Sequence, residues 1–206
     1  MSAFRIAVLA SGSGTNLQAI LDRLHGQGRV EVVAVGSDKP DAVALERAER
    51  AGIGTRVFAA GDYGDRESRD AAIATWLDGI GVDLVVLAGY MQLLSGSFIE
   101  RFRERIINVH PALLPSFPGL DAIGQALRHG VKVSGVTIHF VDAGVDTGPV
   151  ILQEPIRLGS ETDAEAFEAE VHRVEHELLP RAIELIASDR VQTDEANPRV
   201  VRILED

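Results

Sequence analysis

The residues best suited to chemistry in this sequence are an amide and an imidazole that stand two positions apart. Asn108 and His110 follow the apolar residues Ile106 and Ile107, a pattern typical of a β-strand. Because side chains alternate along a strand, we expect Asn108 and His110 on the same face. An amide can hold a developing oxyanion, and a histidine can polarise it or carry a proton at neutral pH. The simpler alternative is that His110 only forms a hydrogen bond in the turn before Pro111.

A second group of polar residues lies in the segment 142–149, which carries two aspartates and two glycines. Aspartates in turns usually bind only the neighbouring backbone. If Asp146 approaches His110, however, it would stabilise the imidazolium, raise the pKa of that histidine and let the pair shuttle a proton. The proline-stiffened segment 112–119 is typical of a pocket wall. His139 lies on a predicted strand, and its spacing leaves open whether it faces this site or the packing around it.

The loop Ser11-Gly12-Ser13-Gly14-Thr15-Asn16 joins the end of one predicted strand to the start of a helix. Free backbone N–H groups and the helix dipole bind anions at such a position, so a phosphate fits there. The alternative is a plain turn in which Thr15 or Asn16 caps the helix. The loop lacks the lysine of a Walker loop, and Leu17 replaces the third glycine of the dinucleotide fingerprint. Asp38 still resembles a ribose-binding acid, which keeps a nicotinamide enzyme as a weaker alternative.

Composition narrows the class of protein. The 206 residues carry a formal net charge of −11, which argues against a nucleic-acid scaffold that neutralises phosphates with clustered cations. The absence of cysteine excludes disulfides, thiolate metal sites and a cysteine nucleophile. No apolar run approaches the ~18 residues of a membrane span, and the start of the chain does not resemble a signal peptide. We therefore expect a cytoplasmic protein that binds neither membranes nor nucleic acids.

The elements that must position these residues follow from hydrophobic periodicity. Short apolar runs bounded by turn residues alternate with stretches of helical spacing, which favours parallel crossovers. Strands are expected at 6–10, 30–35, 57–58, 82–88 and 106–109, and helices at 17–24, 42–51, 66–77 and 98–102. We therefore predict one α/β domain, 1–206, built on a doubly wound, mostly parallel open sheet of Rossmann-like type with helices on both faces. Ligands of such sheets lie beyond the carboxyl ends of the strands.

The carboxyl-terminal half departs from this pattern. Alternation that starts at Val133 and returns at 150–153 predicts an antiparallel addition to the sheet. A capping-box signature beginning at Thr162 predicts a long helix at about 163–187, which Pro180 should kink or restart. The tail after this helix is polar, and we expect it to be loosely packed.

Together these segments resemble the phosphoribosylglycinamide formyltransferase family. The similarity runs in order from about residue 4 to 187, and each motif is weak alone while the combination is specific. The motifs are Ser11-Gly12-Ser13-Gly14-Thr15-Asn16-Leu17, Leu87-Ala88-Gly89-Tyr90-Met91, Asn108-Val109-His110-Pro111, Leu113-Leu114-Pro115 and Asp146-Thr147-Gly148-Pro149-Val150.

The resemblance implies roles for matching positions. It implies a catalytic trio of Asn108, His110 and Asp146, within a folate and catalytic region that spans mainly 88–150. The ribonucleotide-binding residues that it implies are Gly14, Thr15, Asn16, His172, Arg173 and Glu175, with the phosphate site in the amino-terminal half. The folate-binding residues that it implies are Arg66, Met91, Gln92, Leu93, Leu94, Asn108, Asp142, Ala143, Gly144, Val145 and Asp146. From the residues alone, Glu175 would be a solvated carboxylate and Arg66 would form a surface ion pair with Asp65, Glu67 or Asp70.

The implied reaction moves the formyl group of 10-formyltetrahydrofolate to the amine of glycinamide ribonucleotide, a step of purine biosynthesis. No metal is expected, since the sequence offers no clustered histidines and carboxylates for one. A homodimer is left open. Formylfolate hydrolases and methionyl-tRNA formyltransferases share this core but usually carry a further domain. Two departures from the family pattern put the folate contacts in doubt, namely Gln92, where several relatives have a basic residue, and the stretch 121–123, which often includes a histidine.

Overall fold

The computed structural model describes residues 3–159 and 163–204. The chain divides into two compact units, Met1–Ile107 and Asn108–Asp206. The expectation of a single domain over 1–206 stays a prediction.

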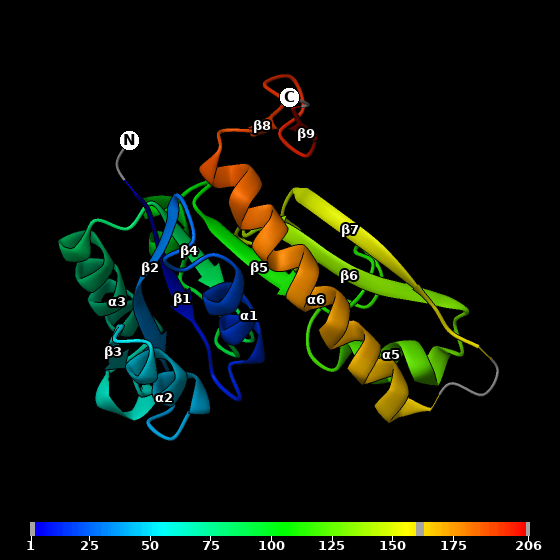
Figure 1. The fold of residues 1–206 in the computed structure, drawn as a ribbon, viewed down its shortest axis with the longest axis horizontal. Helices are drawn as coiled ribbons and strands as arrows, with labels where there is room; N and C mark the ends of the chain where they lie inside the picture. The colour runs from blue at the N-terminus through cyan, green and yellow to red at the C-terminus, as the bar shows by residue number, and fades with distance from the viewer. Residues whose placement is uncertain (1–2, 160–162, 205–206) are drawn as a thin grey trace. The chain divides into compact units, whose positions relative to one another are not determined.

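The first unit is a parallel sheet with helices on either side. Its strands are β1 Phe4–Leu9, β2 Val30–Ser37, β3 Gly54–Val57 and β4 Leu84–Leu87, in the order β3-β2-β1-β4. Each neighbouring pair in that order is parallel. The helices are α1 Thr15–Arg23, α2 Val43–Arg50, α3 Arg66–Ile80 and α4 Gly96–Arg101, with a short 3-10 turn, η1, at Ala60–Asp62. Figure 1 shows α1 and α3 on opposite sides of these strands.

The burial of β1 and β4 explains why this sheet needs two covering layers. All residues of β4 are buried, and so are the last four of β1. A strand buried on both faces shows a continuous apolar run, which is the pattern of parallel sheets covered by helices. β5, Ile106–His110, begins in the last residues of the first unit and ends in the second.

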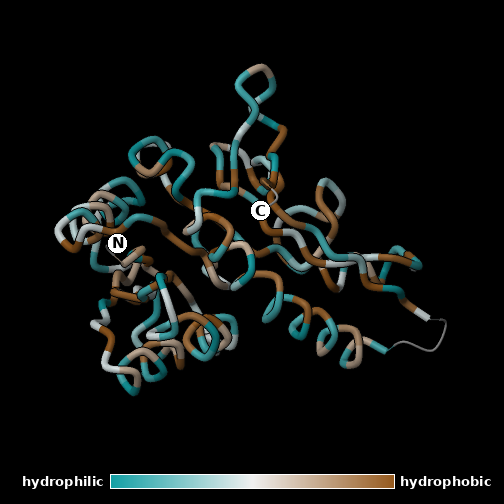
Figure 2. Tube along the Cα trace, turned by 45° about the horizontal axis from the view of Figure 1, so that its top comes forward, coloured by the Kyte–Doolittle hydropathy of each residue, from teal (hydrophilic) through white to brown (hydrophobic). Residues whose placement is uncertain are grey.

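The second unit contains the strand order β5-β6-β7. β6 Val133–Phe140 and β7 Val150–Arg157 pair antiparallel, so the predicted antiparallel addition is confirmed. The long helix α6, Ala164–Ala187, packs along β6 and β7 (Figure 1). Its turns alternate between hydrophobic and hydrophilic residues in Figure 2, as expected for a helix with one buried face.

Two features of α6 differ from expectation. Its amino-terminal cap is Asp163, whose side chain accepts a hydrogen bond from the backbone of Ala166 at 2.7 Å, while Thr162 lies outside the described residues. The helix does not restart at Pro180, which is buried inside one continuous element, while the alternative of a kink stays a prediction. The apolar face packed on the strands outweighs the hydrogen bond that a proline removes.

Two elements of the second unit escaped the sequence analysis. Helix α5, Ala122–His129, follows the proline-rich loop and is capped by Asp121, which accepts from the backbone of Gly124. The tail is not loosely packed throughout, because β8 Val191–Thr193 and β9 Val201–Ile203 form a separate antiparallel pair. The predicted fold class, a mostly parallel α/β sheet with helices and an antiparallel addition, is otherwise confirmed. No helix in the described ranges is long and apolar enough to cross a membrane.

Candidate active site

β5 presents Asn108 and His110 on one side of the strand. Their neighbours Ile107 and Val109 are buried, as alternation requires. Both Asn108 and His110 reach Asp146, at 3.5 Å from the Asn108 amide nitrogen and 3.4 Å from His110 Nδ1. The expectation that the two side chains share a face is therefore met, and the carboxylate of Asp146 meets them both.

The loop that carries Asp146 is held in shape by its own polar groups. The Asp142 carboxylate accepts from the backbone of Gly144 at 3.0 Å and from the Thr147 hydroxyl at 2.6 Å. Gly148 packs so close to the carbonyl of Phe140 that a Cβ would lie 1.8 Å from that oxygen. Asp146 has a φ of 52°, a left-handed conformation that aspartate tolerates better than most residues. Asp142 therefore shapes the loop, while Asp146 is turned toward the strand.

The loop after β5 supplies two further partners. His110 Nε2 lies 2.8 Å from the carbonyl oxygen of Phe117, and the backbone N–H of Gly119 donates to Asp146 Oδ2 at 2.7 Å. A carbonyl only accepts, so His110 Nε2 carries a hydrogen. In the neutral ring, Nδ1 then presents a lone pair toward Asp146. A proton added to His110 would make both ring nitrogens donors to waiting acceptors.

His139, whose direction the sequence left open, belongs to this cluster. The residue is 2% exposed, and its Nε2 lies 3.2 Å from the Asn108 amide nitrogen and 3.6 Å from Asp146 Oδ1. Its Nδ1 lies 2.8 Å from the carbonyl oxygen of Phe140. Alternation along β6 could not have given this direction, because the pairing of β6 with β7 is irregular between Ile138 and His139. Asp146 thus stands between two imidazoles.

The electrostatics of the cluster correct one expectation. Burial lowers the pKa of His110 below its usual value, and this outweighs the opposing effects of the Asp146 carboxylate and the Phe117 carbonyl. The prediction of a raised pKa for His110 was wrong, because it considered the neighbouring charge and not the loss of solvent. Burial also raises the pKa of Asp146, but hydrogen bonds from His139 and Gly119 and the nearby imidazoles lower it overall. At neutral pH the free protein therefore holds an ionised Asp146 beside a neutral His110.

The glycine-rich loop of the first unit is a tight turn into α1. Gly14 occupies the cap position with φ 68°, and no side chain caps the helix, so the alternative of Thr15 or Asn16 as cap was wrong. A Cβ on Gly14 would lie 2.7 Å from Ala44 Cα, because α2 begins against the loop. The backbone N–H of Ala44 also donates to the carbonyl of Gly12 at 3.1 Å. The loop is therefore fixed by a neighbouring helix.

Arg66 is an exposed cation at the start of α3. The three acids expected to pair with it are engaged elsewhere: Asp65 caps α3, Glu67 accepts from Ser97 and Asp70 pairs with Arg69. Among residues 3–159 and 163–204, no carboxylate forms an ion pair with Arg66. The alternative of a surface ion pair was therefore wrong.

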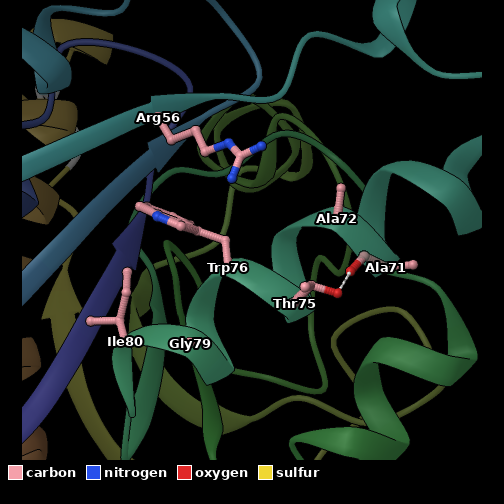
Figure 3. A pocket seen from close by; sticks show the side chains of 7 residues that line it. All are labelled: Arg56, Ala71, Ala72, Thr75, Trp76, Gly79 and Ile80. Atoms are coloured by element: carbon pink, nitrogen blue, oxygen red, sulfur yellow. Dashed lines mark hydrogen bonds between the residues drawn. The ribbon is translucent and has the colours of Figure 1, made fainter.

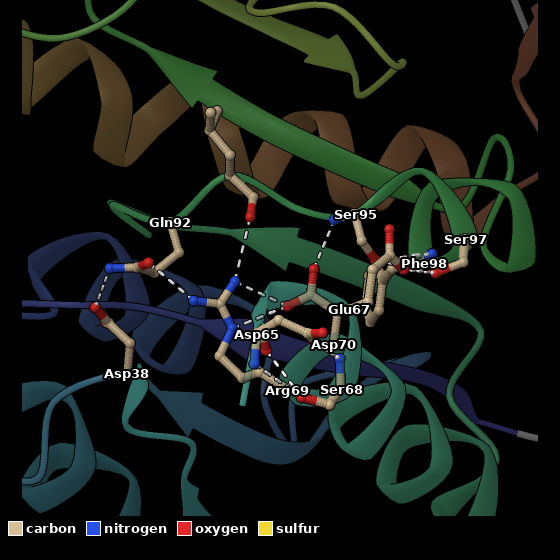
Figure 4. A network of polar contacts seen from close by, with 11 residues as sticks. Asp38, Asp65, Glu67, Ser68, Arg69, Asp70, Gln92, Ser95, Ser97 and Phe98 are labelled. Atoms are coloured by element: carbon tan, nitrogen blue, oxygen red, sulfur yellow. Dashed lines mark hydrogen bonds and ion pairs between the residues drawn. The ribbon is translucent and has the colours of Figure 1, made fainter. Parts of the chain in front are cut away.

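The segment 91–94 alternates between exposed and inward side chains. Met91 and Leu93 are 60% and 59% exposed, whereas Leu94 is buried. Gln92 is held in a network of polar contacts with Arg69 and Asp38, drawn in Figure 4. Two apolar side chains thus face solvent from a segment whose polar side chain is turned inward.

The three expected residues of α6 do not share one environment. Glu175 is 5% exposed, so the expectation of a solvated carboxylate was wrong. Arg173 is exposed and pairs with Glu170 at 2.7 Å and Glu177 at 2.9 Å along the helix surface. Two positions along a helix differ by about 200°, so Arg173 points away from Glu175. The ring of His172 stacks beside that of His176.

A hollow also lies on the first unit (Figure 3). Trp76 and Arg56 line it and both contact Phe58, with ring centroids 5.4 Å apart for Trp76 and the guanidinium 5.1 Å from the Phe58 ring. None of the residues expected to bind substrate or folate lines this hollow. Within the part of the chain that the structure describes, no group of three histidines, aspartates or glutamates is placed to hold a metal ion.

The chain is similar in sequence and structure to known formyltransferases. Residues 4–183 match the formyl transferase family model. The phosphoribosylglycinamide formyltransferase of Bacillus subtilis is 41% identical over 180 residues, which cover 87% of this chain and 92% of that protein. The trifunctional purine biosynthetic protein adenosine-3 of Drosophila melanogaster is 43% identical over 89% of this chain, but the chain spans only 14% of its length. A crystal structure of glycinamide ribonucleotide transformylase 1 from Symbiobacterium toebii has a TM-score of 0.93 and 48% identity, covering 98% of this chain and 95% of that one.

Proposed function

Because the chain belongs to the formyl transferase family, we propose that it transfers the formyl group of 10-formyltetrahydrofolate to the amine of glycinamide ribonucleotide. The products are formylglycinamide ribonucleotide and tetrahydrofolate, in purine biosynthesis. The observation that carries the proposal is the part-buried cluster of Asn108, His110 and Asp146. In it the Asp146 carboxylate lies 3.5 Å from the Asn108 amide nitrogen and 3.4 Å from His110 Nδ1. The named relatives at 41% and 48% identity support the choice of substrates.

In the proposed mechanism the neutral amine of the ribonucleotide attacks the formyl carbon. A carbon–nitrogen bond forms and the formyl oxygen becomes an oxyanion, which accepts hydrogen bonds from the Asn108 amide and from His110 Nε2–H once that group turns from the carbonyl of Phe117. The developing negative charge raises the pKa of His110, so this neutral imidazole takes up a proton from solvent water as the oxyanion forms and returns it when the intermediate collapses. Asp146 stabilises the resulting imidazolium from the Nδ1 side, at 3.4 Å.

The collapse of the intermediate requires a proton to move between two nitrogens. The attacking amine loses a proton, the bond between the formyl carbon and the folate nitrogen breaks, and that nitrogen gains a proton as it leaves. We assign the relay to a water organised by the ionised Asp146. The second histidine, His139, orients Asn108 and Asp146 and is a positioning residue in this scheme.

The binding roles divide among several loops. The backbone N–H groups of Gly14, Thr15 and Asn16 at the start of α1 bind the ribonucleotide phosphate, and Glu175 binds its sugar hydroxyls. The exposed cation Arg66 meets the folate's carboxylate tail, which agrees with the absence of an ion-pair partner for it among the residues that the structure describes. The segments 91–94 and 142–146 bind the rest of the folate. Arg173 is the weakest assignment of the set, since it is already paired with two glutamates.

The test is a spectroscopic transfer assay with 10-formyltetrahydrofolate and glycinamide ribonucleotide. We expect turnover by the native chain and a fall in kcat of roughly a hundredfold or more for His110→Ala, the usual scale for lost acid–base or oxyanion stabilisation. Arg103→Ala, which changes an exposed residue paired with Glu100, serves as a matched control and should keep native turnover. No transfer by the native chain would reject the function. Native rates from His110→Ala would reject the role of the histidine.

A further inference from the structure

The segment between β4 and α4 is anchored although it forms neither helix nor strand. The backbone N–H of Met91 donates to the hydroxyl of Ser11 at 2.8 Å. The carbonyl of Leu93 accepts from Arg69 Nη2 at 3.2 Å, and the backbone N–H of Ser95 donates to Asp70 Oδ2 at 2.6 Å. Three anchors within five residues fix the path of the backbone.

Arg69 supplies the central anchor from the interior. Its side chain is 3% exposed, and its Nε and Nη2 donate to Asp70 Oδ1 at 2.9 and 2.8 Å. The remaining terminal nitrogen, Nη1, donates to Gln92 Oε1 at 2.8 Å. A guanidinium can make these bonds together because its donors lie in one rigid plane. Asp70 balances the charge, and the other donors are directed at Gln92 and Leu93.

Gln92 links this cation to a second buried acid. While Oε1 accepts from Arg69, the amide nitrogen of Gln92 donates to Asp38 Oδ2 at 2.9 Å, as drawn in Figure 4. The amide of Gln92 can accept from a guanidinium and donate to a carboxylate at the same time, which neither a lysine or arginine nor an ionised acid can do. A basic residue would repel Arg69, and an acid would repel Asp38. The two contact partners, Arg69 and Asp38, therefore explain why a glutamine stands at position 92 in place of a basic residue.

Because the Gln92 side chain is held inside, its two neighbours are the side chains that this segment exposes to solvent. The chain bends at Gln92, and its neighbours Met91 and Leu93 are 60% and 59% exposed while Gln92 is held by its two inward hydrogen bonds. Large exposed apolar side chains on a fixed backbone are a common feature of ligand-binding surfaces. Flat, partly apolar heterocycles are the ligands that such a surface suits.

We propose that Asp38, Gln92 and Arg69 form a clamp that positions Met91 and Leu93 as the apolar wall for the heterocycle of the formyl donor. The proposal rests on the proposed function, which assigns 91–94 to folate. The clamp acts through the side chains of its three residues on Met91 and Leu93, so these side chains are positioning groups. Their loss raises the KM for the formyl donor and leaves the KM for the ribonucleotide unchanged.

The experiment is a charge-exchange pair. Gln92→Glu keeps the acceptor for Arg69 but sets two carboxylates against each other at Asp38, and we expect the KM for the formyl donor to rise roughly tenfold. Adding Asp38→Asn restores a donor opposite the new carboxylate, and the KM should return to within about threefold of native. Gln92→Met removes both hydrogen bonds without adding charge and should give a similar tenfold rise. Gln27→Glu, at an exposed glutamine, is the matched control and leaves both KM values at the native level.

Melting temperatures of all variants confirm that each is folded before its kinetics are compared. The clamp is rejected if Gln92→Glu and Gln92→Met leave the donor KM unchanged, if both KM values rise together, or if the double variant shows no recovery. These outcomes are distinct from failure of the proposed function, in which the native chain itself transfers no formyl group.

Discussion

Two buried polar clusters of this molecule are built from similar groups and differ in how completely those groups are bonded. In the first unit, Arg69 and Asp70 are joined by bonds of 2.8–2.9 Å, and both oxygens of Asp70 are used. In the second unit, Asp146 lies 3.4 Å from one imidazole and 3.6 Å from another. In the first cluster both carboxylate oxygens of Asp70 already accept short hydrogen bonds. In the second, the contacts between Asp146 and the imidazoles are long, and protonation of His110 would shorten its contact with Asp146.

The difference follows from the charged groups involved. A guanidinium is always protonated, so the pair of Arg69 and Asp70 has one stable charge state. The imidazole of His110 can change its charge, so the carboxylate of Asp146 serves a group whose charge is not fixed. We infer that the first cluster stabilises the fold and that the second is kept responsive for chemistry. Substitutions in the two clusters should therefore affect different measurements.

The largest effect is expected from the cluster of Arg69 and Asp70. Asp70→Ala leaves the buried Arg69 without its counter-charge and the Ser95 N–H without its acceptor, and should lower the unfolding free energy by about 3–5 kcal/mol. Urea unfolding measures this loss, and kcat of the folded fraction at saturating substrate should stay within about threefold of native. Asp78→Ala breaks an exposed pair with Arg101 and should cost less than about 1 kcal/mol. If Asp70→Ala and Asp78→Ala lowered the unfolding free energy equally, the cluster of Arg69 and Asp70 would have no special role in stability.

The next effect belongs to the responsive cluster and is kinetic. Asp146→Asn should lower kcat roughly a hundredfold, or about 2.7 kcal/mol in activation free energy, because the amide cannot stabilise an imidazolium as a carboxylate does. Asparagine tolerates the left-handed backbone at φ 52°, so the melting temperature should change little. The transfer assay and a thermal melt, with Asp41→Asn as an exposed control, provide the check. A large loss of stability with native turnover would show that Asp146 is structural.

A smaller effect concerns the pH dependence of stability. Because burial lowers the pKa of His110 from its usual 6.5, the unfolded chain binds this proton at a higher pH than the folded one. The unfolding free energy contributed by this group therefore falls as pH drops below about 6.5, until the folded histidine titrates too. His110→Gln should weaken the decline between pH 7.5 and 5.5 in urea unfolding. NMR titration of the native chain should place the His110 pKa below 6.5, and a value above that would contradict the direction.

The smallest effect tests whether the tail influences the Asp146 loop. Arg199, between β8 and β9, donates to the carbonyl of Thr147 at 3.0 Å. Because this contact is exposed, Arg199→Ala should cost about 0.5 kcal/mol and change kcat less than about twofold. Urea unfolding and the transfer assay measure both. A tenfold loss of kcat would mean that the hairpin belongs to the responsive cluster.

Most of the fold could be predicted from the sequence, because buried parallel strands leave continuous apolar runs. The elements that were missed lack such runs. Helix α5 is short and begins directly after Asp121, whose φ of 57° is typical of a turn. The strands of the tail, β8 and β9, are each only three residues long. Neither pattern stands out from a polar loop in the sequence.

The candidate site could be predicted only where alternation along a strand determines which way a side chain points. Alternation placed Asn108 and His110 on one face, but it could not decide between two directions for His139. Burial was the main missing quantity. It reversed the expected pKa direction of His110, made Glu175 a buried acid, and depends on contacts that a local sequence pattern does not contain.

The close approach of Gly14 to α2 restricts how this enzyme could be redesigned. The obstacle to any larger residue at position 14 is the Cα and Cβ of Ala44, which cannot rotate away as a long side chain would. The positive φ of Gly14 adds a second obstacle of a different kind. A saturation library at position 14 should therefore return glycine almost alone among active clones. Retargeting the loop to a bulkier or differently charged ligand would have to begin with substitutions in the first turn of α2.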